Sequence, residues 1–177
     1  MNHELSAIPI TIAVIFHSGF GHTARQAEAV RRGIERVAGA SALYITSEEA
    51  QGRLDDLELA DAIIFGAPTY MGSVSGPFKT FMDSTSKAYS TGAWKDKIAA
   101  GFTNSASRSG DKLATLTQFA ILAAQHGMHW VNLGLPPGNN STRGSDQDLN
   151  RLGFWLGAAA QSNNDQGPAL RHPNPIF

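Results

Sequence analysis

The sequence contains no cysteine and almost no excess charge of either sign, and each lack excludes a class of function. Without cysteine there is no disulfide, no thiol nucleophile, no zinc–cysteine site and no cysteine-bound iron–sulfur cluster. Lys and Arg number 14 against 15 Asp and Glu, so the formal net charge is -1. This balance gives no electrostatic basis for binding nucleic acid or an anionic membrane.

A long apolar run and a secretory leader are also lacking. The apolar run over residues 8–16 is too short to span a bilayer, and it contains Pro9 and Thr11. The first five residues lack the basic start of a signal peptide. We therefore expect a cytoplasmic protein with no membrane insertion.

The alternation of apolar and amphipathic stretches predicts an α/β fold, a doubly wound five-stranded parallel sheet with helices on both faces. β-Branched or nearly continuous apolar runs predict strands at residues 8–16, 42–45, 62–66, 98–102 and 128–133. Apolar residues spaced three and four positions apart predict helices at 23–38, 76–87 and 112–125. We also expect a short helix or loop at 51–59 and a possible helix at 146–160. We expect one domain over residues 1–162 and a poorly ordered, polar, Pro-rich tail over 163–177.

Ligands of such sheets bind beyond the carboxyl ends of the strands, which makes the loop after the first strand the first candidate. This loop, residues 18–23, offers two glycines, two hydroxyl groups and the free N–H groups of a helix start, which is chemistry for a phosphate. It lacks both the Lys of a nucleoside-triphosphate loop and the third Gly of a dinucleotide loop. A metal-free monophosphate fits it, and the alternative is a plain helix cap by Ser18 or Thr23.

Two further loops follow buried strands. In residues 68–73, Tyr70 and Met71 could bracket a flat ring, although a surface turn is the alternative. Residues 104–111 carry small hydroxyl side chains that suit the edge of a heteroaromatic ring, and a solvated turn is the alternative there. The histidines have no Asp or Glu at ligand spacing, so we expect no metal site.

Several separate motifs then match one family. They are Gly66-Ala67-Pro68-Thr69-Tyr70-Met71-Gly72-Ser73, Lys79-Thr80-Phe81-Met82-Asp83, Thr91-Gly92-Ala93 and His126-Gly127-Met128. In this order, within residues 10–133, they resemble the flavodoxin superfamily, most closely the WrbA-type NAD(P)H:quinone oxidoreductases and related NADPH-dependent FMN reductases. The resemblance implies a flavodoxin-like fold, an FMN cofactor, NAD(P)H as co-substrate, a quinone-like electron acceptor and a homodimer or homotetramer.

The resemblance also implies roles for single residues. His126 matches a histidine beside the pyrimidine end of the flavin, and Tyr89 matches an aromatic that borders the quinone and nicotinamide pocket. We expect His126, at the end of its helix, to reach the crevice near the third loop. The cofactor-binding residues expected from the loops and the resemblance are Ser18, Gly19, Phe20, Gly21, His22, Thr23, Pro68, Thr69, Tyr70, Met71, Gly72, Ser73, Asn104, Ser105, Ala106, Ser107, Gly110 and His126.

Two functions stay open at this point. The first is an enzyme, an NAD(P)H-dependent two-electron reductase of quinones. The alternative is a flavodoxin-type electron carrier without its own NAD(P)H site. Carriers of that kind are usually strongly acidic, so a net charge of -1 favours the enzyme.

Two structural questions stay open as well. The family ends in an amphipathic helix, which here is either residues 146–160 or absent, with the Pro-rich end in its place. Tyr89 and Trp94 lie in a polar stretch, so they mark a subunit interface or else cover the end of the helix over residues 76–87.

Overall fold

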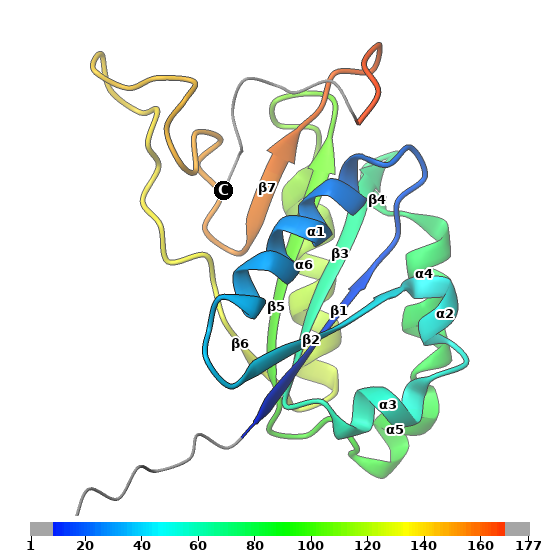
Figure 1. The fold of residues 1–177 in the computed structure, drawn as a ribbon. Coiled ribbons are helices and arrows are strands. Elements are labelled where there is room, and N and C mark those ends of the chain that lie inside the picture. Colours follow the sequence, from blue (N-terminus) through cyan, green and yellow to red (C-terminus); the bar gives the residue numbers. More distant parts are fainter. Residues whose placement is uncertain (1–8, 169–177) are drawn as a thin grey trace, which may run out of the picture.

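The computed structural model describes residues 9–168, and within them a twisted parallel sheet carries helices on both faces (Figure 1). The strand order β2-β1-β3-β5-β6 confirms the doubly wound α/β fold, in which the chain reverses its winding direction at β1. The strands are β1 Ile10–Phe16, β2 Ala40–Thr46, β3 Ala62–Tyr70, β4 Ser73–Val74, β5 Ile98–Ser105, β6 His129–Trp130 and β7 Ala158–Gln161. The helices are α1 His22–Glu35, α2 Ser47–Ala50, α3 Leu54–Leu59, α4 Gly76–Ser84, α5 Ser86–Thr91 and α6 Lys112–Gln125.

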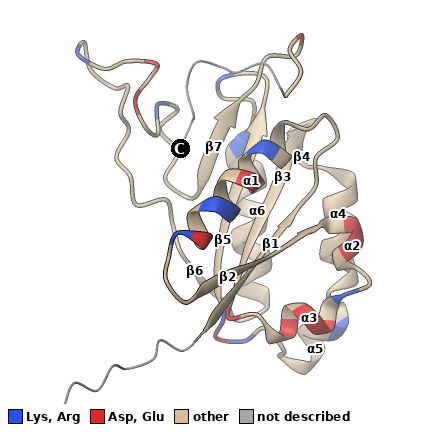
Figure 2. Ribbon diagram, in the orientation of Figure 1, with Lys and Arg blue, Asp and Glu red and all other residues tan. Residues whose placement is uncertain are grey.

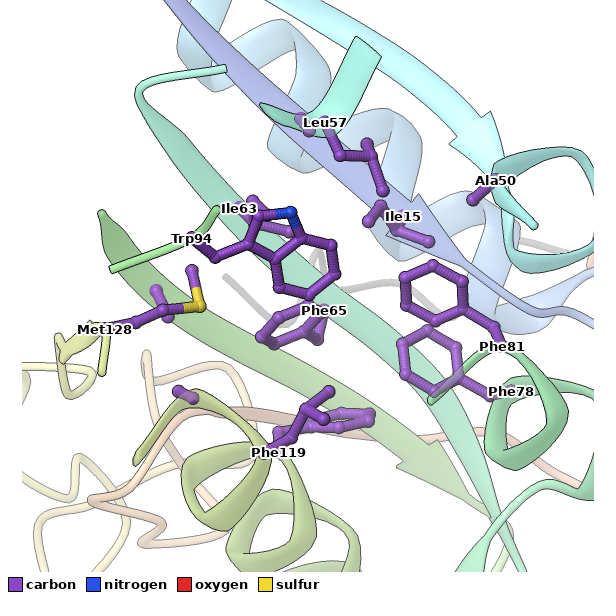
Figure 3. Close-up of a cluster of buried hydrophobic side chains, with 14 of the residues drawn as sticks. Ile15, Ala50, Leu57, Ile63, Phe65, Phe78, Phe81, Trp94, Phe119 and Met128 are labelled. Atoms are coloured by element: carbon purple, nitrogen blue, oxygen red, sulfur yellow. The ribbon is translucent and has the colours of Figure 1, made fainter. Parts of the chain in front are cut away.

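Both faces of the central strands are buried, which explains their continuous apolar runs. On one face, α1 packs on Val14, Phe16 and Phe102 through Ala27 and Ile34. The other face carries a larger core beneath α4 and α6 (Figure 3).

An aromatic cluster forms the centre of that larger core. The Phe119 ring of α6 lies 5.9 Å from Phe65 of β3 and 5.0 Å from Phe78 of α4, measured between centroids. Phe81 continues the cluster to Trp94 at 6.4 Å. Trp94 is fully buried, so this ring covers the α4 helix and is not itself a surface contact.

The fifth position of the sheet is built from two separate segments. The sequence predicted one strand at 128–133, but β6 occupies only 129–130 and pairs with the start of β5. The end of β5 pairs instead with β7, in parallel, from Phe102↔Ala158 to Ser105↔Gln161. Residues 131–157 leave the sheet and return between these two pairings, as the yellow and orange excursion in Figure 1 shows.

The prediction of a possible helix at 146–160 is wrong. Asn150 (φ 49°) and Gly153 (φ 74°) have left-handed backbone conformations, which an α-helix cannot contain. Asn150 instead connects two parts of the segment 131–157, because its side-chain amide donates to the carbonyls of Leu135 and Phe154. Alanine favours helices, but Ala158–Gln161 forms a strand because it pairs with the end of β5, which β6 leaves unpaired. Within residues 9–168, no helix follows α6.

The remaining expectations need smaller changes. The helix predicted at 76–87 is divided at Thr85 into α4 and α5, and the stretch around 51–59 forms α3, preceded by α2. Ile8 and residues 169–177, which belong to the predicted first strand and tail, lie outside the described residues. Among residues 9–168, no helix is long and apolar enough to cross a bilayer. Figure 2 shows basic and acidic residues side by side along α1.

The aromatic cluster predicts where the fold is most sensitive. Phe119→Ala removes a fully buried ring that contacts two others, and we expect it to lower the free energy of unfolding by about 3–5 kcal/mol. Leu113→Ala, on the exposed face of the same helix, is the matched control and should change stability by less than ~0.5 kcal/mol. Urea denaturation of both variants measures this, and equal losses would contradict the assignment of the core.

Candidate functional site

A pocket of 1070 Å³ opens at the carboxyl edge of the sheet, where the sequence placed the ligand site. Four segments line it: the three predicted loops and the segment after β7. The lining residues are Ser18, Phe20, His22, Thr23, Pro68, Thr69, Tyr70, Met71, Gly72, Asn104, Ser105, Ala106, Ser107, Gly110, Asp111, Ser162, Asn163, Asn164, Asp165, Gln166 and Gly167.

The first loop presents unsatisfied backbone donors at the start of α1. Gly21, the residue that caps the helix, has φ 84° and makes no side-chain cap. The Ser18 hydroxyl accepts from the N–H of Ala24 at 3.0 Å, so part of the predicted cap is present. The N–H groups of residues 19–23 donate to no group within the described chain. These donors, together with the positive end of the helix dipole, form a binding site for an anion.

The second loop supplies an aromatic wall. Tyr70 ends β3, and its ring lies edge-on to Phe20 with centroids 6.2 Å apart. A Cβ on Gly19 would lie 2.9 Å from the Tyr70 hydroxyl, so the absence of a side chain there lets the ring close over the first loop. Burial raises the pKa of Tyr70, which keeps the phenol protonated. Met71 is fully exposed with φ 48°, so its thioether stands at the pocket mouth.

The third loop follows β5 and is held in place by hydrogen bonds from the end of β7 and the residue after it. Asn104 accepts from the Ser162 hydroxyl at 2.7 Å, and Gln161 donates to the Ala106 carbonyl at 3.0 Å. Beneath the loop, Thr69 joins Thr103 and Thr115 through buried hydroxyl contacts of 2.9 and 2.8 Å. These contacts link β3, β5 and α6, so the second and third loops keep a fixed separation.

The segment Ser162–Gly167 was not identified from the sequence. The sequence predicts a domain boundary and tail there, yet the segment lines the pocket. Pro168 then packs on the first loop, since a Cβ on Gly21 would lie only 2.7 Å from its Cγ. Only its polar composition was visible in the sequence, and such a composition carries no positional signal.

The structure brings most predicted site residues together, and five lie elsewhere. Gly19 and Gly21 shape the first loop without lining the cavity, and Ser73 hydrogen-bonds with Gln118. Tyr89 and His126 lie near the opposite edge of the sheet. The carbonyl of Gly127, next to His126, accepts from the Asp96 amide just before β5 begins.

The expected position of His126 is therefore wrong. A crossover helix runs antiparallel to its strands, so its last residue lies at their amino ends. His126 is buried there against Trp94, with ring centroids 4.3 Å apart, and Tyr89 stands edge-on to it at 6.1 Å. Its Nε2 contacts the Thr85 hydroxyl at 2.9 Å. Burial lowers the pKa of His126, which favours the neutral imidazole.

Charge in the pocket comes from carboxylates. Asp111 and Asp165 line it, and no Lys or Arg does so among the described residues. No group of three or more His, Cys, Asp or Glu within residues 9–168 could hold a metal ion. Among the described residues, an anion would thus be held by backbone amides and polar side chains without a lysine or arginine.

Comparisons with known proteins agree with this geometry. The family model described as NADPH-dependent FMN reductase matches residues 15–139. Flavodoxin FldP of Pseudomonas aeruginosa is 47% identical, over 86% of this chain and 81% of that protein. An NAD(P)H dehydrogenase (quinone) of Syntrophobacter fumaroxidans is 31% identical, over 87% and 89%. The crystal structure of a flavodoxin, WrbA-like protein from Agrobacterium tumefaciens has a TM-score of 0.65 at 41% identity, over 86% and 83%.

The first loop allows a sharp test of phosphate binding. Gly21→Asp adds a carboxylate among the free amides, and we expect it to weaken FMN binding at least ~100-fold, about 3 kcal/mol. Gly21→Asn is the matched control, because it adds similar bulk against Pro168 and tolerates the same left-handed backbone. Fluorescence titration of both variants with FMN measures the difference. Equal affinities for the two variants would place the phosphate elsewhere.

Proposed function

Because this chain belongs to the NADPH-dependent FMN reductase family, we propose that it binds FMN in the carboxyl-edge pocket and uses it to reduce a quinone-like acceptor with two electrons from NAD(P)H. The observation that carries the proposal is the set of free N–H groups of residues 19–23 in a pocket without lining cations. A phosphate monoester matches this donor set, because it needs neither a lysine nor a metal ion. When bound, FMN supplies the redox chemistry.

The protein's own groups act by binding and orienting. The first loop would hold the phosphate, with the Ser18 and Thr23 hydroxyls beside the amides. Tyr70 and Met71 would flank the isoalloxazine, and the third loop would meet its polar edge. The buried Thr69–Thr103–Thr115 contacts keep these two walls in register, so the ring is held at a fixed angle.

An electron carrier is the second candidate, and the name of one relative favours it. Flavodoxin FldP is described as a flavodoxin, and its identity to this chain exceeds that of the quinone dehydrogenases. Against a carrier stands the net charge of -1, since carriers of this kind rely on strong acidity to meet basic partners. The two candidates differ in one property, reduction by a nicotinamide.

Cofactor choice and electron source can be measured together. We expect the protein to bind FMN more tightly than riboflavin or FAD, with affinity unchanged by EDTA, because the first loop recognises one phosphate. Under anaerobic conditions, NADH or NADPH should bleach the visible flavin absorbance, and a quinone should restore it. Reduction by dithionite but by neither nicotinamide would assign the carrier function. Equal affinity for riboflavin would contradict the phosphate site.

We also propose that Tyr89 borders the flavin pocket of a second copy of this chain. Its ring is 60% exposed, distant from its own pocket, and backed by the buried His126. Two buried nitrogens beside it, His126 Nδ1 and Trp94 Nε1, have no hydrogen-bond partner among the described residues. A homodimer or homotetramer would join this aromatic group to a neighbouring site, with His126 acting as a positioning residue behind Tyr89.

The oligomeric state of the protein and its KM for the acceptor test this arrangement. Tyr89→Ala should raise the KM for the acceptor about tenfold, while FMN affinity stays within about twofold, because the ring meets only the acceptor side. Val37→Ala, which removes another side chain that is 60% exposed, is the control. Light scattering at micromolar concentration should show at least a dimer. An active, strictly monomeric protein whose KM is unaffected by Tyr89→Ala would refute the proposal.

A further inference from the structure

Lys112, the first residue of α6, is a fully buried lysine whose ammonium contacts only backbone carbonyls. Its Nζ donates to the carbonyl oxygens of Ser107 at 2.6 Å, Arg108 at 3.1 Å and Ser109 at 3.4 Å. Among residues 9–168 it forms no ion pair with a carboxylate. A buried ammonium at the positive end of a helix, without a counter-charge, opposes folding. A role outside folding would explain why such a residue stands here.

The geometry of the loop indicates that role. In a trans peptide, the C=O and N–H groups point in opposite directions. Three successive carbonyls turned toward Lys112 therefore turn the next three N–H groups, those of Arg108, Ser109 and Gly110, away from it. None of these N–H groups donates to any group in the described chain. Ser107 and Gly110, at the two ends of this turn, line the pocket, whereas Arg108 and Ser109 do not. The turn therefore borders the pocket, and the N–H of Gly110 is the donor that belongs to a lining residue.

We propose that Lys112 is a positioning residue of the flavin site, which gathers the carbonyls of residues 107–109 and so presents their opposite N–H groups to the acceptor atoms at the edge of the bound isoalloxazine. This inference rests on the proposed function. The ligand chemistry is that of a heteroaromatic ring with carbonyl and imine acceptors on one edge, which requires donors at fixed spacing. Lys112 itself does not reach the ligand.

The charges around Lys112 make its action depend on pH. Burial, and then the positive charge of Arg151 on the segment before β7, lower the pKa of Lys112 to about 8. Arg151 is itself 3.6 Å from Asp146 and donates to Gln161. The side chains of Arg108 and Asp111, on the loop itself, are exposed. As pH rises through about 8, Lys112 loses its charge, its hydrogen bonds to the loop weaken, and FMN affinity should fall.

Stability should change in the opposite direction. In the unfolded chain Lys112 has its ordinary pKa of 10.5, so between about pH 8 and 10.5 the unfolded state holds the extra proton. The free energy of unfolding therefore rises with pH across this window, as the cost of the buried charge is relieved. Loss of FMN affinity alongside rising stability of the apo-protein separates positioning from a general structural role.

Lys112→Met and Lys97→Met form a matched pair for the experiment. Lys97 also donates to two backbone carbonyls, those of Glu58 and Ala60, but at the opposite edge of the sheet. We expect Lys112→Met to bind FMN and riboflavin at least ~10-fold more weakly at pH 7, by the same factor for both, with no further loss up to pH 9. Lys97→Met should follow the wild type. Lys112→Gln, which keeps two donors, should lie between them.

Backbone NMR order parameters of the flavin-free protein give a readout without the ligand. Those of residues 108–110 should fall in Lys112→Met, while those of α6 stay unchanged. A folded Lys112→Met with wild-type FMN affinity would overturn the proposal, as would a pH-dependent loss of affinity that persists in this variant. If Lys112→Met fails to fold, the wild-type affinity from pH 7 to 9 decides, and a flat profile overturns the proposal. A wild type that binds no FMN refutes the proposed function, and the order parameters still test how Lys112 orders the loop.

Discussion

The packing of Phe119 against Phe65 and Phe78 is the contact on which the pocket depends. Each of these rings belongs to an element that leads into or out of a pocket loop. Phe65 lies on β3, which continues into the second loop, and Phe119 lies on α6, which begins at the third. The aromatic cluster, drawn in Figure 3, therefore acts with the buried contacts of Thr69 to Thr103 and Thr115 to fix how far apart the loops stand. Polar groups on loops can act together only when a rigid core fixes their spacing.

In the proposed site, backbone groups would determine selectivity more than charged side chains. The start of α1 exposes one row of N–H groups, and the loop held by Lys112 exposes another. In the proposed flavin site, both rows would recognise the ligand by the fixed direction of their N–H groups, because the surrounding fold fixes each peptide dipole. The carboxylates of Asp111 and Asp165 at the wall disfavour anions that do not meet these donors. The proposed cofactor, a neutral ring with a single phosphate, would satisfy this arrangement.

The sequence predicted those parts of the site that local patterns determine. The change from continuous apolar residues to helical spacing around Gly21 located the first loop, and similar transitions after Phe65 and Phe102 located the others. The parts of the site that the sequence did not predict depend on strand pairing between residues far apart in the chain. Ala158–Gln161 has the composition of a helix, and only the open end of β5 makes it a strand. Ser162–Gly167 reaches the pocket for the same reason. The position of His126 was a different error, since the direction of a crossover helix follows from topology alone.

The division of the fifth sheet position between β6 and β7 affects the order in which the protein forms. The pairing of β5 with β7 joins residues farther apart in sequence than the pairings of β1 with β2, β1 with β3 or β3 with β5. During synthesis this pairing follows the others, because Ala158–Gln161 leaves the ribosome after β1, β2, β3 and β5. A chain emerging during synthesis can thus bury both apolar cores first. The pocket wall formed by residues 162–167 is completed only when β7 has paired with β5.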